Sequence, residues 1–201
     1  MSGPARGGGT FPVAGGTFVA VVGPSGAGKD SVMAYARERL AQDATVHFVR
    51  RVITRPAVPS LEDHDTMSPA AFATAQAAGA FALSWTSHGL SYGIPVAVDE
   101  EIRSGRVAVA NLSRGVLPDL RSRYANFLVA EITASPEVLA RRLALRGRET
   151  DKEIAARLAR TVAEERSAGD RHIIDNSGAL ADAGDSFIAL VLSGVRAPAI
   201  G

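Results

Sequence analysis

Short apolar runs alternate along the chain with longer segments in which apolar residues recur at helical spacing. The runs are apolar on both faces, as expected for strands of a sheet that helices cover on each side. Strands are predicted at Thr17–Val22, Thr45–Ile53, Arg106–Ala110, Asn126–Ile132 and His172–Asp175. Helices are predicted at Asp30–Leu40, Ser68–Ala78, Pro95–Ser104, Ser113–Arg123, Ser135–Arg146, Asp151–Ser167 and Ala179–Leu192. The alternation predicts a three-layer α/β/α fold with a five-stranded parallel core sheet.

One segment, Phe81–Pro95, interrupts this alternation, and we interpret it as a small antiparallel excursion. The chain has no internal repeat and no interdomain linker, so we predict a single domain over residues 17–195. Residues 1–16 are rich in glycine and predict a disordered tail, and residues 196–201 form a C-terminal tail.

Composition limits the classes of protein and partner. The 201 residues are 46% hydrophobic and 21% charged, which is typical of a soluble globular protein, and a net charge of +1 gives no reason to expect nucleic acid or a membrane as partner. Cysteine is absent, which excludes disulfides, thiolate metal sites and a cysteine nucleophile. The N-terminal segment lacks the apolar core of a signal peptide, so we expect a cytoplasmic protein; a homodimer stays open.

A glycine-rich loop follows the first predicted strand and opens the first predicted helix. Its sequence, Gly-Pro-Ser-Gly-Ala-Gly-Lys-Asp-Ser, contains the GxxxxGK pattern in the setting that a phosphate loop requires. The glycines let consecutive backbone N–H groups point at one phosphate, and the helix N-terminus adds to the attraction. Lys29 is placed to bridge the β- and γ-phosphates of ATP and to act in transfer. We predict ATP binding by Gly23, Pro24, Ser25, Gly26, Ala27, Gly28, Lys29, Asp30 and Ser31.

Asp30 departs from the usual pattern, because most phosphate loops have Ser or Thr there as a magnesium ligand. A carboxylate oxygen also suits Mg²⁺. The alternative is an acidic residue that the dipole of the helix favours in its first turn. An additional anion beside a triphosphate is unfavourable without a metal, so we favour Asp30 as the Mg²⁺ ligand.

Arginines cluster downstream of this loop, at Arg146, Arg148, Arg157 and Arg160. One interpretation is a solvated helix face in which glutamates pair with the arginines. We favour an arginine-rich lid over about residues 146–160, because transfer between two anions needs cations to offset the crowded charge. We therefore predict catalytic roles for Arg148, Arg157 and Arg160, and nucleotide binding by Arg146.

The order of motifs resembles the guanylate-kinase branch of the nucleoside monophosphate kinases, from residue 17 to about residue 178. The resemblance implies a P-loop kinase fold with an acceptor-binding region at about 54–98. It rests on the phosphate loop, Thr54-Arg55-Pro56, Gly79-Ala80-Phe81 leading to Trp85, Tyr92-Gly93, Arg142-Leu143 with Arg146-Gly147, and Ile174-Asp175-Asn176. The base-reading positions differ: Ser84 replaces a glutamate, Ile94 a Ser or Thr, and Asn111 an acid. A site that has lost its hydrogen-bond partners discriminates against the base, so we do not expect GMP as acceptor.

The chain resembles more closely the ribose 1,5-bisphosphate phosphokinase family of phosphonate catabolism. The matching motifs are Gly-Pro-Ser-Gly-x-Gly-Lys-Asp-Ser, Arg50-Arg51-Val52-Ile53-Thr54-Arg55-Pro56, Glu62-Asp63-His64-Asp65, His88-Gly89-Leu90-x-Tyr92-Gly93-Ile94-Pro95 and Ala110-Asn111-x-Ser113-Arg114. The resemblance implies transfer of the ATP γ-phosphate to a phosphosugar, ribose 1,5-bisphosphate, with ATP and Mg²⁺ as cofactors. It implies substrate binding by Arg51, Arg55, Asp63, Asp65, Ser84, His88, Tyr92, Asn111 and Arg114.

Three of these residues have a second interpretation. Asp63 and Asp65 either bind magnesium or sugar hydroxyls, or belong to a solvated acidic loop. The sequence favours neither interpretation over the other. His88 lines the acceptor pocket, or is a polar turn residue before Gly89. Other kinases of the same fold, and an inactive binding module, remain the rival hypotheses.

Overall fold

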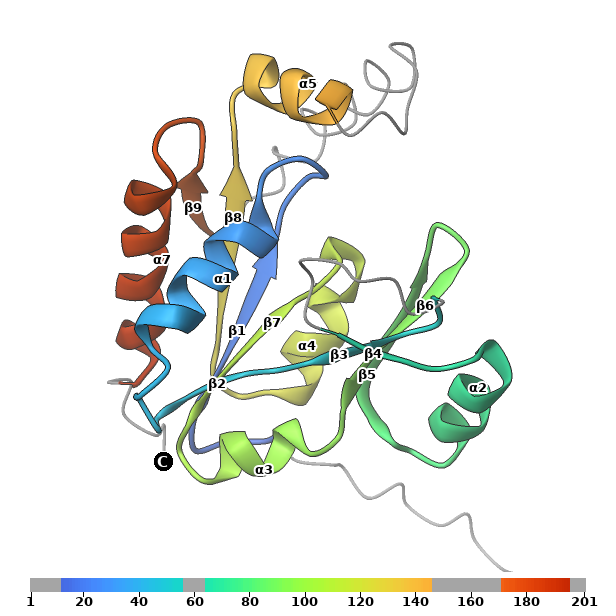
Figure 1. Ribbon diagram of the computed structural model, residues 1–201. Coiled ribbons are helices and arrows are strands. Elements are labelled where there is room, and N and C mark those ends of the chain that lie inside the picture. Colours follow the sequence, from blue (N-terminus) through green and yellow to red (C-terminus); the bar gives the residue numbers. More distant parts are fainter. Residues whose placement is uncertain (1–11, 56–63, 146–170, 196–201) are drawn as a thin grey trace, which may run out of the picture.

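The computed structural model describes residues 12–55, 64–145 and 171–195, and its core is a five-stranded parallel sheet in the order β2-β7-β1-β8-β9 (Figure 1). The strands are β1 (Thr17–Val22), β2 (Val46–Phe48), β7 (Val107–Asn111), β8 (Phe127–Thr133) and β9 (Arg171–Asp175). All of their pairings are parallel. The carboxyl ends of the strands therefore meet at one edge, which is where open α/β sheets bind ligands. The predicted parallel sheet is confirmed.

Different helices cover the two faces of this sheet. They are α1 (Lys29–Arg39), α3 (Val98–Arg103), α4 (Leu117–Arg123), α5 (Pro136–Leu145) and α7 (Leu180–Val195), with a 3₁₀ turn, η1 (Arg114–Val116), before α4. Helix α2 (Pro69–Ala77) packs on a second sheet instead. Alternate β1 residues divide between two cores: Phe18 and Ala20 pack with α3 and α4, whereas Val19 and Val21 pack with α1 and α7. The three-layer prediction is confirmed.

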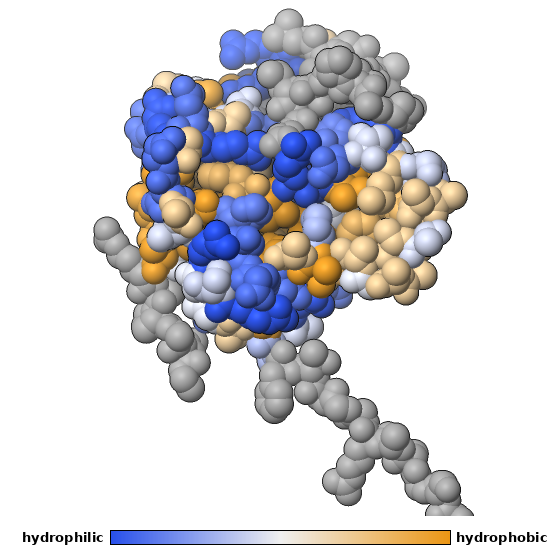
Figure 2. Space-filling model, turned by 60° about the horizontal axis from the view of Figure 1, so that its bottom comes forward, coloured by the Kyte–Doolittle hydropathy of each residue, from blue (hydrophilic) through white to orange (hydrophobic). Residues whose placement is uncertain are grey.

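A second, four-stranded sheet lies beside the core sheet, in the order β4-β3-β6-β5. Its strands are β3 (Arg51–Ile53), β4 (His64–Thr66), β5 (Phe81–Ser87) and β6 (Leu90–Pro95). Strands β5 and β6 form an antiparallel hairpin, which confirms the predicted excursion. Helix α2 is attached to this sheet by Phe72, whose ring stacks on Phe81 at 4.5 Å. Most of α2 is exposed and alanine-rich, and it contributes the pale hydrophobic region in Figure 2.

The predicted strand Thr45–Ile53 is wrong as a single element. Its first part is β2, and the Val49 N–H still donates to the Val109 carbonyl of β7. The chain then leaves the core sheet at the exposed Arg50, and β3 pairs with β4 and β6 instead. Because Val52 and Ile53 are buried against β6 in the second sheet, the same apolar run serves two sheets.

Other boundaries differ for local reasons. Strand β6 retains Pro95, so α3 starts three residues later than predicted, at Val98. The predicted helix Ser113–Arg123 divides into η1 and α4, with a proline in the first turn of α4. The predicted caps are present: the hydroxyl of Ser68 accepts from Ala71 N–H at 3.2 Å, and that of Ser135 from Val138 N–H at 3.4 Å.

The last residues of the expected N-terminal tail pack against the domain. Val13 exchanges backbone hydrogen bonds with the chain at Arg123 and Ala125. Gly16 is buried, and a Cβ there would lie 1.9 Å from the Arg106 carbonyl oxygen. The expectation of disorder is therefore wrong for residues 12–16. In the described part of the chain, no helix is both long enough and apolar enough to cross a membrane.

Candidate functional site

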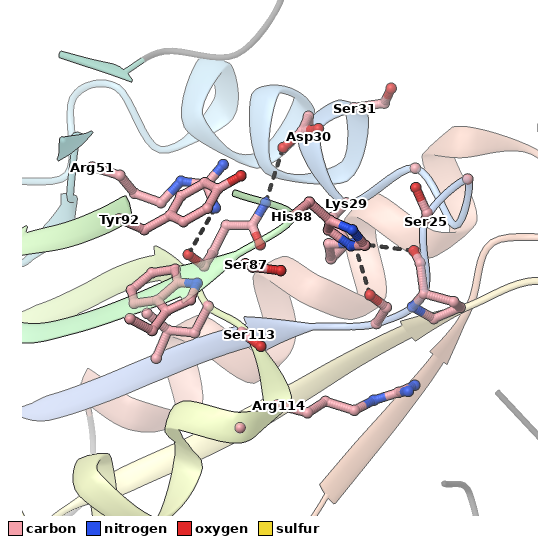
Figure 3. A pocket seen from close by; sticks show the side chains of 18 of the residues that line it. Ser25, Lys29, Asp30, Ser31, Arg51, Ser87, His88, Tyr92, Ser113 and Arg114 are labelled. Atoms are coloured by element: carbon pink, nitrogen blue, oxygen red, sulfur yellow. Dashed lines mark hydrogen bonds between the residues drawn. The ribbon is translucent and has the colours of Figure 1, made fainter. Parts of the chain in front are cut away.

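A cavity of about 490 Å³ opens at the carboxyl edge of the core sheet, between the loop after β1 and the hairpin of the second sheet. The phosphate loop forms one side, the β5–β6 hairpin faces it, and the segment after β7 forms the floor (Figure 3). The lining residues are Gly23, Pro24, Ser25, Gly26, Gly28, Lys29, Asp30, Ser31, Arg51, Arg55, Trp85, Ser87, His88, Tyr92, Asn111, Leu112, Ser113, Arg114 and Gly115.

The turn of the phosphate loop requires glycine at positions 23 and 28. Gly23 has φ 144°, and a Cβ there would lie 2.1 Å from the backbone oxygen of Ile132 on β8. Gly28 has φ 86° and precedes the first residue of α1. The loop thereby turns sharply between strand and helix, and the N-terminus of α1 opens on the cavity, which favours a bound anion.

Two side chains brace the loop from behind. The buried Asn176 amide donates to the Ala27 carbonyl at 2.7 Å, and Arg142 donates to the Asn176 carbonyl at 2.9 Å and to that of Ala27 at 3.4 Å. Ala27 itself is fully buried and does not line the cavity. Its side chain packs in the core. The prediction that Ala27 binds nucleotide concerns the backbone of the loop, and it stays a prediction.

Lys29 lies at the mouth of the loop. Its ammonium group donates to the carbonyl of Gly23 at 2.8 Å and to that of Pro24 at 3.0 Å, as the dashed lines in Figure 3 indicate. Both hydrogen bonds are to the first residues of the phosphate loop, so they hold the Lys29 ammonium group against the loop. The same short reach suits contact with a phosphate seated in the loop.

Asp30 also faces the cavity, and its carboxylate has a defined position. The Asn111 side chain, at the end of β7, donates from Nδ2 to Asp30 Oδ1 at 3.0 Å. Asn111 is 7% exposed, so this amide is held by the sheet. The carboxylate of Asp30 and the side chain of Asn111 therefore lie together next to the phosphate loop, and their oxygen atoms are of the hard kind that suits Mg²⁺. Within the described residues, no group of three or more His, Asp or Glu side chains forms a closed metal site.

The wall opposite the loop is aromatic and basic. The rings of Trp85 and Tyr92 stack at 5.2 Å with an interplanar angle of 7°. The guanidinium of Arg51 lies 5.7 Å from the Tyr92 ring centre and donates to the Asn111 carbonyl at 3.2 Å. Arg55 lies 3.4 Å from the ring of His64 on β4. The wall thus combines flat apolar surface with fixed positive charge.

His88 forms the tip of the hairpin that carries this wall. His88 has φ 50° and Gly89 φ 74°, so both central residues of the two-residue turn lie in the left-handed region, as in type I′ turns. For a residue other than glycine, this backbone conformation costs roughly 1–2 kcal/mol. His88 is therefore a turn residue that also lines the cavity, and its contact with an acceptor stays a prediction.

Two predicted substrate residues are not brought to the cavity. Ser84 accepts a hydrogen bond from Gln76 of α2 at 2.9 Å, because alternate β5 residues face opposite sides and the cavity side holds Trp85 and Ser87. Asp65 lies in β4, exposed, in an ion pair with Arg50 at 2.9 Å. Five further predictions fall outside the described residues: Asp63, Arg146, Arg148, Arg157 and Arg160.

Sequence reasoning missed one buried carboxylate beside the cavity. Glu131 of β8 is 2% exposed and pairs with Arg114 and Arg171. The signal was present, because Glu131 is the single charged residue in a strand that is otherwise apolar as far as its last residue, Thr133.

A parallel sheet with a glycine-rich phosphate loop after its central strand defines a P-loop kinase fold. The solved structure of guanylate kinase from Anaplasma phagocytophilum has this fold, with a TM-score of 0.71 and 16% identity over 94% of this chain and 92% of that one. No family model matches the chain.

Curated relatives then identify the family. The "ribose 1,5-bisphosphate phosphokinase PhnN" of Chelativorans sp. (strain BNC1) is 54% identical over 179 residues, which cover 89% of this chain and 86% of the relative. The protein of the same name from Brucella melitensis is 53% identical, and the match covers 86% of this chain and 90% of that protein. The one from Pseudofrankia inefficax is 48% identical, and the match covers 91% of this chain and 94% of that protein. The chain belongs to the ribose 1,5-bisphosphate phosphokinase family, and the family resemblance is confirmed.

Proposed function

We propose that the protein transfers the γ-phosphate of ATP to the 1-phosphate of ribose 1,5-bisphosphate, giving 5-phospho-α-D-ribose 1-diphosphate and ADP. The observation that carries this proposal is a single cavity in which a phosphate loop faces arginines and an aromatic wall. Family membership supports the same reaction. The acceptor carries two phosphates and no base, which suits a wall that retains arginines and lacks the groups that read guanine.

Transfer needs positioning and charge stabilisation more than proton removal. An oxygen of the acceptor's 1-phosphate, already ionised near neutral pH, forms a bond to the γ-phosphorus while the bond to the bridging β–γ oxygen breaks. The loop amides hold the β- and γ-phosphates, and Lys29 follows the charge that moves toward ADP. Holding both anions within one cavity makes the step effectively unimolecular.

We assign the Mg²⁺ site to Asp30, with Asn111 beside it. A Mg²⁺ ion held there would offset negative charge on the phosphates of ATP. The hydrogen bond from Asn111 leaves Asp30 with a second carboxylate oxygen and fixes where that oxygen lies. The lid role of Arg146, Arg148, Arg157 and Arg160, and the role of Asp63, remain predictions from the sequence.

The Asp30→Asn variant is expected to need more Mg²⁺. Asparagine keeps an oxygen that accepts from Asn111, so the fold is retained, but the formal charge beside the metal is lost. We expect the Mg²⁺ concentration for half-maximal activity to rise roughly 10- to 100-fold. Titrating Mg²⁺ at saturating ATP measures this change. An unaltered Mg²⁺ dependence would assign Asp30 to the helix dipole instead.

On the acceptor side, we assign Arg51, Arg55 and Arg114 to the two acceptor phosphates, since planar guanidinium groups bind phosphate bidentately. The stacked pair of Trp85 and Tyr92 offers a flat surface to the sugar. His88 at the hairpin tip and Asn111 on the floor supply polar groups for hydroxyls or phosphate oxygens. The cavity thereby contains cations for both ends of a bisphosphate.

The Ser84→Glu variant is expected to gain no GMP kinase activity. A glutamate there replaces a side chain that bonds to Gln76 on the far side of β5, and Ile94 is fully buried in the core. The new carboxylate therefore does not face the cavity in which guanine would lie. A coupled ADP assay with GMP as acceptor measures this. GMP turnover above that of the wild type would contradict the assigned orientation of β5.

The reaction itself is tested by supplying ATP, Mg²⁺ and a panel of phosphorylated sugars and nucleoside monophosphates, with products identified by mass spectrometry. The expected product is 5-phospho-α-D-ribose 1-diphosphate from ribose 1,5-bisphosphate. Turnover of a different acceptor alone would favour another kinase of this fold. Failure to bind Mg·ATP in a direct titration would favour an inactive binding module.

A further inference from the structure

Glu131 places a carboxylate inside the core sheet, where every neighbouring position is apolar. It lies between Ala130 and Ile132 on β8, and those two residues belong to the core on the side of α1 and α7. Val129, two residues before Glu131, belongs to the core on the side of α3 and α4. Since alternate strand residues face opposite sides, Glu131 points toward α3, α4 and the second sheet, which is the side of the acceptor wall.

Both oxygens of this carboxylate are engaged. Oε1 accepts from Arg114 Nη2 at 2.5 Å, and Oε2 accepts from Arg171 Nη1 at 3.0 Å. The side chains are mostly buried, with 3% of Glu131, 18% of Arg114 and 11% of Arg171 exposed. Because both oxygens accept hydrogen bonds, the Glu131 carboxylate cannot rotate freely. The position of the Arg114 guanidinium that it binds is therefore fixed as well.

The two arginines come from different elements. Arg114 is the first residue of η1, directly after the floor of the cavity, and Arg171 is the first residue of β9. Of the two, Arg114 lines the cavity. In Figure 3 its side chain extends from its turn across the strands of the sheet. Glu131 therefore connects a cavity-lining cation to the centre of the core.

Stability alone gives little reason for such an arrangement. Removing charges from water costs free energy that the ion pair repays only in part, and apolar replacements are often as stable. Asp99 shows the alternative role: it binds Arg123 and Tyr124 where α3 meets α4, and neither it nor these partners line the cavity. That cluster joins helices, whereas the Glu131 cluster reaches the ligand site.

We infer that Glu131 is a positioning residue that holds the Arg114 guanidinium at the cavity wall, where Arg114 binds a phosphate of the acceptor. The inference rests on the proposed function, in that the acceptor is a phosphorylated molecule. Glu131 does not itself line the cavity, so it acts through Arg114. Arg171 occupies the second oxygen and keeps the carboxylate from turning away.

A double-mutant cycle tests this inference, with Glu131→Gln, Arg114→Ala and the double variant compared with wild type. Glutamine keeps the volume but loses the charge that orients the guanidinium. We expect Glu131→Gln to raise KM for the acceptor about 10- to 100-fold, with KM for ATP little changed. In the Arg114→Ala background, the same substitution is expected to add little, because its target is already gone.

The matched control is Asp99→Asn, which also removes a buried carboxylate that holds arginine. It is expected to lower the melting temperature without changing KM for the acceptor. A Glu131→Gln effect of equal size in both backgrounds would overturn the inference, and so would a loss of melting temperature alone. If Glu131→Gln does not fold, Glu131→Asp, which keeps the charge, enters the cycle in its place with the same expected non-additivity.

The cycle also separates this inference from the proposed reaction. If the wild type does not use ribose 1,5-bisphosphate, the proposed reaction fails, and the cycle is run with the phosphorylated acceptor that the panel identifies. If the wild type uses ribose 1,5-bisphosphate and the cycle is additive, the reaction stands and the role of Glu131 falls.

Discussion

Replacing Lys29 by alanine is expected to lower kcat about 1,000-fold or more, the range found when a preorganised donor to developing charge is removed. No other lysine lies in the described residues, and Lys29 is the ammonium group at the entrance of the phosphate loop. Without the Lys29 ammonium group, no lysine of the described residues offsets the negative charge that builds on the oxygen between the β- and γ-phosphates of ATP. Single-turnover measurements with saturating ATP and acceptor check this expectation.

The fold is expected to survive this substitution. Lys29 donates two hydrogen bonds to loop carbonyls, so its removal costs about 1–2 kcal/mol. Lys29→Met serves as the matched variant, because it keeps an aliphatic side chain of similar length without the charge. Both variants are expected to be inactive and folded. Recovery of turnover in Lys29→Met would mean that packing, and not charge, is what Lys29 supplies.

Replacing Gly23 by alanine is expected to destabilise the protein by about 3 kcal/mol or more, because the added methyl meets a backbone that cannot yield. The Cβ would lie 2.1 Å from the Ile132 carbonyl oxygen, in the buried strand next to β1, and φ at Gly23 is 144°. Any relief moves the start of the phosphate loop. ATP affinity is therefore expected to fall about 100-fold or more, since displacements near 1 Å have effects of that size.

Gly105→Ala provides the comparison for this prediction. Gly105 also has a positive φ, 84°, but nothing lies within 4 Å of a Cβ there. That variant is expected to lose about 1–2 kcal/mol from backbone strain alone, with ATP affinity retained. Thermal unfolding and an ATP titration measure both variants. Equal stability losses in the two would show that contact with Ile132 is not what requires glycine at position 23.

Much of the fold follows from local patterns in the sequence. The buried strand Thr17–Val22 is predicted with its observed bounds, because it is apolar on both faces and ends at a glycine. The split of Thr45–Ile53 was not predictable from periodicity, since the apolar residues on either side of Arg50 look alike and differ only in the sheet that they join. Long-range pairing, not local preference, decides that boundary.

The residues of the candidate site likewise divide into those that the sequence predicts and those that it does not. Gly23, Lys29 and Asp30 form a contiguous motif whose chemistry is local, so sequence reasoning brings them together. Ser84 was misplaced because a motif position carries no information on which face of β5 it occupies. Glu131 was overlooked because its partners lie 17 residues before it and 40 residues after it in the chain.

The bracing of the phosphate loop has a consequence for synthesis on the ribosome. The loop lies near the start of the chain, but Asn176 and Arg142 support it, and α7 packs on the helix that follows it. The Thr17 hydroxyl at the start of β1 likewise donates to the Gly194 carbonyl. A nascent chain therefore contains the whole nucleotide-binding motif long before the residues that hold this motif in shape, up to Gly194, have been synthesised.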